Sequence, residues 1–178
     1  MIRVLIALLA ALVVVGTAGV VRRLSFTDAR LMEHARRAAD ALASTRHGLD
    51  PRGLISASPP EKALRAAAAG GPGLQLLRKK LSDRALASMG VLVVLLVIAL
   101  GLFRRSRLAH GVGVATCVLI AAGALAALWP ALRAYRLVGD GIVAWELCEL
   151  MLLAVLAVAF VVISMLAGPL REAEGGPR

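Results

Sequence analysis

Four long runs of apolar residues constrain this chain more than any other feature of its sequence. They cover residues 4–21, 85–103, 108–129 and 142–168, and charged residues are nearly absent from their interiors. A helix needs about 20 residues to cross the hydrocarbon core of a bilayer. Only helices or closed barrels satisfy the backbone polar groups in lipid. The sequence therefore predicts an all-α integral membrane protein with four transmembrane helices and a helical extramembrane insertion between the first two.

The polar segments between these runs divide the chain into four parts. We interpret residues 1–23 as the first transmembrane helix, an uncleaved signal anchor, although the small residues at 16–18 would suit a cleavage site. Residues 24–84 are predicted to form the basic insertion, 85–168 to hold transmembrane helices 2–4, and 169–178 to form a flexible polar tail. Pro130 and Pro169 are expected to end the third and fourth spans, because proline lacks the N–H that continues a helix.

Capping signals inside the insertion predict where its helices begin. Ser25 with Asp28, and Ser58 with Glu61, each place a hydroxyl three residues before a carboxylate, which is the pattern of a capping box. A turn is expected at 50–53, where proline and glycine follow aspartate. A third helix, basic and amphipathic, is expected to begin at Leu74 and to lie on the membrane surface before the second span.

The apolar faces of the insertion helices are narrow and rich in alanine. The face of the first helix recurs at helical spacing and consists of Leu31, Ala35, Ala38 and Leu42. Burial stabilises a protein by about 25 cal/mol per Å² of apolar surface, and alanine offers little of it. We therefore expect the insertion to need support from the membrane or from another protein.

Small residues recur at a spacing of four along the third span. One row is Ala109, Gly113, Cys117 and Ala121, and a second row begins with Gly111 and Ala115. Small side chains let helix backbones approach closely in lipid. The two rows predict helix packing on two sides, which would place this helix at the centre of the bundle.

The formal net charge of +10 comes largely from Arg and Lys that flank the spans. We expect these residues to meet anionic lipid headgroups, and no nucleic-acid partner is predicted. The short loops favour an N-terminus and a C-terminus in the cytoplasm, with residues 24–84 outside. Counting the basic residues of the long loop favours the reverse orientation. The bias toward Arg and Ala indicates a bacterial source, and hence the inner membrane.

Two acidic residues, Glu146 and Glu149, open the fourth span on one face of its helix. Because successive spans alternate in direction, they are expected to lie near the level of Arg84, Arg133 and Arg136. We predict an interfacial set of ion pairs or a contact with a partner subunit. The alternative is a site for a proton or cation, because carboxylates within a membrane are costly and often functional.

The sequence contains no motif for nucleophilic, metal-dependent or phosphate-binding catalysis. No enzyme activity, metal or cofactor is therefore predicted. The small-residue rows of the third span, and an insertion that needs outside support, favour a non-catalytic accessory or assembly subunit of a larger membrane protein complex. The alternatives are a small transporter or ion-pathway component using Glu146 and Glu149, and a membrane-anchored sensor.

Overall fold

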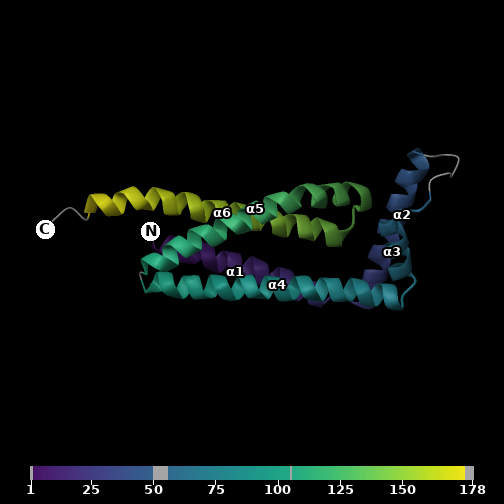
Figure 1. Ribbon diagram of the computed structural model, residues 1–178, viewed down its shortest axis with the longest axis horizontal. Helices are drawn as coiled ribbons and strands as arrows, with labels where there is room; N and C mark the ends of the chain where they lie inside the picture. Colours follow the sequence, from purple (N-terminus) through teal and green to yellow (C-terminus); the bar gives the residue numbers. More distant parts are fainter. Residues whose placement is uncertain (1, 50–55, 105, 175–178) are drawn as a thin grey trace. The chain divides into compact units, whose positions relative to one another are not determined.

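The computed structural model describes residues 2–49, 56–104 and 106–174, and over these residues it contains six helices and no strand (Figure 1). The helices are α1 (Ile2–Leu24), α2 (Asp28–Leu49), α3 (Pro59–Ala68), α4 (Pro72–Phe103), α5 (Arg107–Val138) and α6 (Gly141–Glu174). Four of them, α1, α4, α5 and α6, are long and apolar enough to span a membrane. The predicted fold class, an all-α membrane protein with four spans, is confirmed.

The chain forms two compact units, which we name for the residues that they bury. The apolar unit comprises Met1–Val20, Ala87–Trp129 and Cys148–Arg178. The polar unit comprises Val21–Leu86 and Pro130–Leu147. Each of the four long helices contributes residues to both units.

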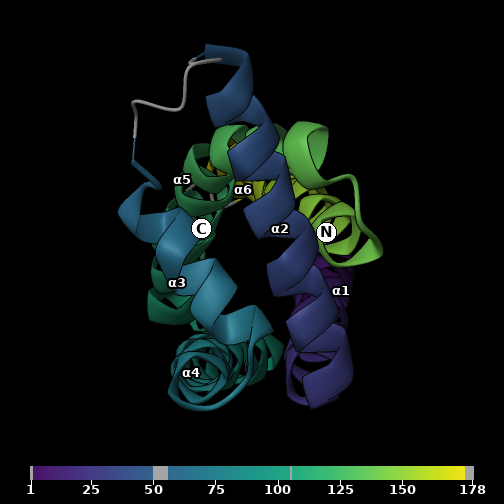
Figure 2. The ribbon, with the colours of Figure 1, turned by 90° about the vertical axis from the view of Figure 1, so that its right-hand side faces the viewer.

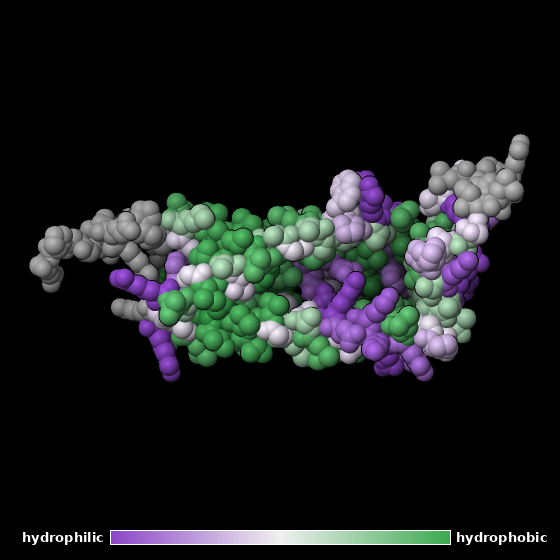
Figure 3. All heavy atoms as spheres, viewed as in Figure 1, coloured by the Kyte–Doolittle hydropathy of each residue, from purple (hydrophilic) through white to green (hydrophobic). Residues whose placement is uncertain are grey.

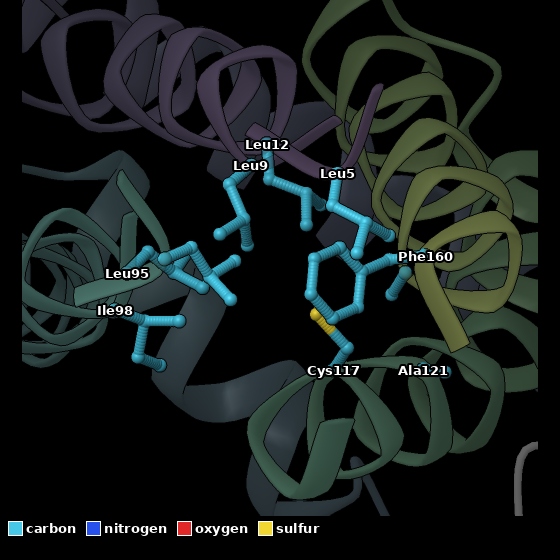
Figure 4. Packing of buried hydrophobic residues seen from close by; sticks show 10 residues of the cluster. Leu5, Leu9, Leu12, Leu95, Ile98, Cys117, Ala121 and Phe160 are labelled. Carbon is cyan, nitrogen blue, oxygen red and sulfur yellow. The ribbon is translucent and has the colours of Figure 1, made fainter. Parts of the chain in front are cut away.

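In the apolar unit, segments of α1, α4, α5 and α6 run side by side around a core of large aliphatic side chains (Figure 1). Figure 4 shows the core, in which leucines of α1 and α4 face the ring of Phe160 from α6. Phe160 is fully buried. Most of the face of this unit seen in Figure 3 is hydrophobic, as lipid contact requires.

The first small-residue row of α5 lies against this core. Gly113, Cys117 and Ala121 are buried. A Cβ atom added at Gly113 would come within 3.0 Å of Ile98 Cγ2 and 3.3 Å of the Phe160 ring. A small residue is needed here because the neighbouring side chains already fill the space.

The second row of α5 is exposed, and this corrects the prediction of a central helix. Gly111 and Ala115 lie on the outside of the chain, as do Ala122 and Ala126 further along. The two rows have the same spacing of four, so periodicity predicted packing for both. In the structure, only the row that contains Gly113 faces other helices of the chain. Packing of the second row against a separate protein stays a prediction.

In the polar unit, α2 and α3 pack side by side (Figure 2). The predicted face of α2 is turned inward: Leu31, Ala35 and Ala38 are buried, and Leu42 is half-buried. Gly73 permits a close approach of α4 to α3, because a Cβ atom there would lie 2.5 Å from the Ala66 backbone carbon. Gly70 and Gly71, with φ of 83° and 65°, form the turn that makes this approach possible.

Of the two predicted helix starts, the N-cap at Ser58 is confirmed and the one at Ser25 is wrong. The Glu61 carboxylate pairs with arginines and does not complete the predicted capping box. Ser58 caps α3 by accepting a hydrogen bond from the Glu61 amide at 3.4 Å. Ser25 instead belongs to the end of α1, where its hydroxyl donates to the Arg22 carbonyl at 2.9 Å. The first α2 hydrogen bond runs from the Leu31 amide to the Thr27 carbonyl, because α1 continues to Leu24 and three residues, 25–27, connect it to α2.

The two prolines predicted to end spans lie inside helices. The α5 helix passes Pro130 and runs to Val138, and α6 passes Pro169 and runs to Glu174. Proline is tolerated in long membrane helices, and the residues after each proline are good helix formers. The predicted flexible tail is therefore helical as far as Glu174, and residues 175–178 lie outside the described residues.

The predicted amphipathic helix at Leu74 and the second span are one continuous helix, α4. Its first turns have the predicted faces: Leu74, Leu77 and Leu81 are half-buried, whereas Arg78 and Arg84 are exposed. The predicted turn at 50–53 lies outside the described residues.

Candidate functional site: charged residues near the ends of the spans

Asp140 occupies the tight connection between α5 and α6. Gly139 ends α5 with a φ of 62°, and its amide donates to the Tyr135 carbonyl at 2.8 Å. Asp140 then caps α6, because its Oδ1 accepts a hydrogen bond from the Val143 amide at 3.0 Å. This carboxylate is only 6% exposed, so it needs further partners.

The second oxygen of Asp140 binds the ring of His34, which comes from α2. An ionised carboxylate only accepts hydrogen bonds, so the His34 Nδ1 atom carries the proton in this pair. Burial acts to raise the pKa of Asp140, but the hydrogen bonds from His34 and from the Val143 and Ile142 amides outweigh it and lower the pKa below its ordinary value. Asp140 thus joins α2 to the start of α6 as a charged group.

Arg22, near the end of α1, stacks on an aromatic ring. Its guanidinium carbon lies 4.4 Å from the centre of the Trp145 ring. Trp145 lies in the second turn of α6, and a tryptophan side chain presents an apolar body with one polar N–H. The stack is a cation–π contact between the first and last spans of the chain.

Arg84 and Glu146, two members of the predicted ion-pair set, lie near each other, and Arg133 and Glu149 also have interactions within the chain. The Arg84 Nη1 atom lies 3.8 Å from the Glu146 Oε1 atom, and the two side chains are 72% and 43% exposed. Such an open pair contributes little stability. Arg133 and Arg136 are exposed side chains near the end of α5.

Glu149 has a different environment from Glu146, although only three residues separate them on α6. Glu149 is 6% exposed and belongs to the apolar unit. It lies against Gly19 of α1, where an added Cβ atom would come 2.1 Å from its Oε1 atom. Gly19 therefore provides the room in which this carboxylate is buried.

Glu61 of α3 is a buried carboxylate that was predicted only as part of a helix cap and not as a member of an ion pair. It is 1% exposed and pairs with Arg65 at 3.0 Å and with Arg46 of α2 at 3.3 Å. The spacing of four between Glu61 and Arg65 was a visible signal. The contact with Arg46 had none, because the two residues lie on different helices.

The described residues contain no group of three or more His, Cys, Asp or Glu side chains arranged to hold a metal ion. Cys117 is buried in the core of the apolar unit, and Cys148 is exposed. The charged groups described above are suited to structural pairing, helix capping and contact with anions.

Comparisons with protein-family models, with curated proteins and with solved structures find no match to this chain. What the chain is therefore follows from its own helices. It is a multi-pass membrane protein.

Proposed function

We propose that the chain is a non-catalytic accessory or assembly subunit of a larger membrane protein complex in the bacterial inner membrane. The observation that carries the proposal is the exposed small-residue row of α5. Gly111, Ala115, Ala122 and Ala126 lie along one outer side of this helix, and all four are exposed.

This row differs from the lipid-facing surface of α4. There, exposed positions carry large side chains, such as Val93, Leu96, Val97 and Leu100. Large side chains fill the space beside acyl chains, whereas Gly and Ala leave a shallow track into which a partner helix fits closely. A Cβ atom at Gly111 would meet no described atom within 4 Å, so the track is open.

The polar unit gives a second reason for a partner. Its buried hydrophobic residues are mainly alanines of α2 and α3, among them Ala35, Ala39, Ala43 and Ala67. Alanine contributes little burial energy, so this unit would gain from contact with another subunit or with headgroups.

Purification from native membranes tests the proposal. A tagged chain in mild detergent is expected to retain a fixed set of larger membrane proteins at constant ratio. The Gly111→Leu variant should lose them, because its side chain blocks the track. Gly90→Leu is the matched control, since Gly90 is also an exposed membrane-helix glycine with open space around it. Recovery of the chain alone, or equal losses in both variants, would contradict the proposal.

The orientation of the proposed subunit places both termini in the cytoplasm and residues 24–84 outside. The charge of the short loops supports this arrangement. Fused after Gly71, a reporter that works only outside the cytoplasm should be active, and one that works only in the cytoplasm should be inactive. Activity of a cytoplasmic reporter at this position would reverse the orientation.

The burial of Glu149 favours a second candidate function, an ion-pathway component. A carboxylate enclosed among apolar helices is costly to maintain and is a common device for moving protons or cations. Under this candidate, Glu149→Gln abolishes ion flux into liposomes, whereas Glu146→Gln, which alters an exposed pair, leaves the flux unchanged. An absence of flux in the wild-type protein would reject it.

A further inference from the structure

The polar unit contains a hollow of about 400 Å³ between the end of α1, one face of α2 and the start of α6. Its wall includes Arg22, Phe26, Arg30, His34, Arg37 and Asp140. The volume lies near the lower end of small-molecule sites, which span roughly 300–1,000 Å³. This hollow serves neither of the functions proposed above.

Positive charge is in excess around this hollow. Three arginines and two carboxylates line it, which leaves one positive charge in excess before His34 is counted. Both carboxylates are already engaged. Glu33 accepts from the Arg37 Nε atom at 2.9 Å, and Asp140 is bound by His34 and by the Val143 amide. The wall therefore favours an anion as its ligand.

Arg22 provides an unused donor in this wall. Its Nε atom is buried and has no hydrogen-bond partner among the described residues. The stack on Trp145 engages the flat face of the guanidinium, whereas the Nε donor points along its plane. A buried donor without an acceptor is costly, so an acceptor on a ligand would relieve this cost.

The chemistry of the wall matches a phosphate group. Guanidinium groups bind phosphate oxygens with paired, charge-assisted hydrogen bonds. The hollow also has apolar walls, at Phe26, Ala29 and Ile142. Arg22 directly follows the first apolar run and Ile142 begins the fourth, so the sequence places both residues at the boundary between lipid and water.

We propose that this hollow binds a phosphate group, and the apolar walls favour an anionic phospholipid headgroup as its source. A second hollow of about 390 Å³, lined by residues that include Arg23, Arg78 and Lys79, has no buried donor without a hydrogen-bond partner among the described residues. There Arg78 is committed to Asp28 at 3.0 Å, and Arg23 already has an interaction within the chain.

The stack of Arg22 on Trp145 supplies a local signal for binding. The chain has two tryptophans, so Trp129→Phe leaves Trp145 as the only indole. The full-length Trp129→Phe protein in mild detergent would be titrated with short-chain phosphatidylglycerol, with diacylglycerol as the phosphate-free lipid and inorganic phosphate as the soluble anion. Saturable change in Trp145 fluorescence is expected with phosphatidylglycerol and not with diacylglycerol.

Two arginine variants on α2 decide whether the signal comes from this hollow. Arg30→Gln should weaken binding about five-fold, the loss expected for one cation beside an anionic headgroup. Arg36→Gln makes the same change at an exposed position of α2 outside the wall, and should leave binding unchanged. Equal weakening in both variants, or no saturable response to either phosphate-bearing probe, would overturn the proposal. Arg30-dependent binding of inorganic phosphate without binding of phosphatidylglycerol would keep the phosphate site and reject the lipid as its source.

Discussion

The two units of this chain bury different kinds of side chain. The apolar unit buries mainly leucines from α1 and α4 and the ring of Phe160, with Glu149 as its one buried carboxylate among the described residues. The polar unit buries mostly alanine, together with the carboxylates of Glu61 and Asp140. The first unit is thus held by interlocking large side chains, which suits a bundle in lipid, where burial from water cannot drive packing between helices. The second is held by helix caps and charge pairs.

This difference predicts different sensitivities to mutation. The apolar unit should respond to lost volume and tolerate changes on its outer face. The polar unit should respond to a lost partner, since a buried charge without its counter-charge is destabilising. Substitution of a buried group, beside substitution of its exposed equivalent, tests this contrast.

Truncation of the buried aromatic ring should have the largest effect. Phe160→Ala is expected to cost about 3–5 kcal/mol, because it leaves a cavity among close-packed side chains. Unfolding in mixed detergent micelles, followed by circular dichroism, measures this loss. Phe103→Ala is the matched control, because Phe103 is 77% exposed. Similar losses in both variants would show that Phe160 does not organise the apolar core.

Removal of the buried charge in α3 should have the next largest effect. Glu61→Gln keeps the shape of the side chain but leaves Arg46 and Arg65 without their carboxylate, at an expected cost of about 2 kcal/mol. Hydrogen exchange of the α2 and α3 amides should rise in this variant. Unchanged exchange would mean that alanine packing alone holds these helices together.

The Asp140 carboxylate should make the polar unit less stable as the pH falls into the acid range. Its pKa is lowered in the folded protein, so its contribution is complete above the unfolded pKa of about 3.9 and is lost as the pH falls through the lower folded pKa. Asp140→Asn keeps a good helix cap but removes the charge.

Thermal unfolding measured at several pH values tests this expectation. The wild-type protein should lose stability relative to Asp140→Asn as the pH falls below about 4. An identical pH dependence in the two proteins would contradict a lowered pKa of Asp140 in the folded protein.

Neutralisation of the exposed pair should have the smallest effect. Glu146→Gln makes the same chemical change as Glu61→Gln, but at a carboxylate that is 43% exposed and 3.8 Å from its arginine. The expected loss is below about 0.5 kcal/mol. Measured beside Glu61→Gln under the same conditions, it isolates the effect of burial. A loss as large as that of Glu61→Gln would break the contrast between open and buried pairs.

Some helix ends could be predicted from the sequence and others could not. The Ser58 cap was predictable because its hydrogen bond spans only three residues. The ends predicted at Pro130 and Pro169 were wrong, because a proline costs one hydrogen bond and the residues that follow it restore the helix. The α5 helix ends instead at Gly139, which adopts a positive φ.

The sequence by itself determined the four spans, the inward face of α2 and the small-residue rows of α5. These features depend on composition and on periodicity along a single helix. Only the tertiary structure decided which row of α5 is packed, that His34 meets Asp140, that Arg46 meets Glu61, and that Arg22 stacks on Trp145. These contacts join residues on different helices, and the rotation of each helix about its own axis sets which of its faces meet a neighbour. Periodicity along one helix identifies the faces available, but only packing against the other helices selects among them.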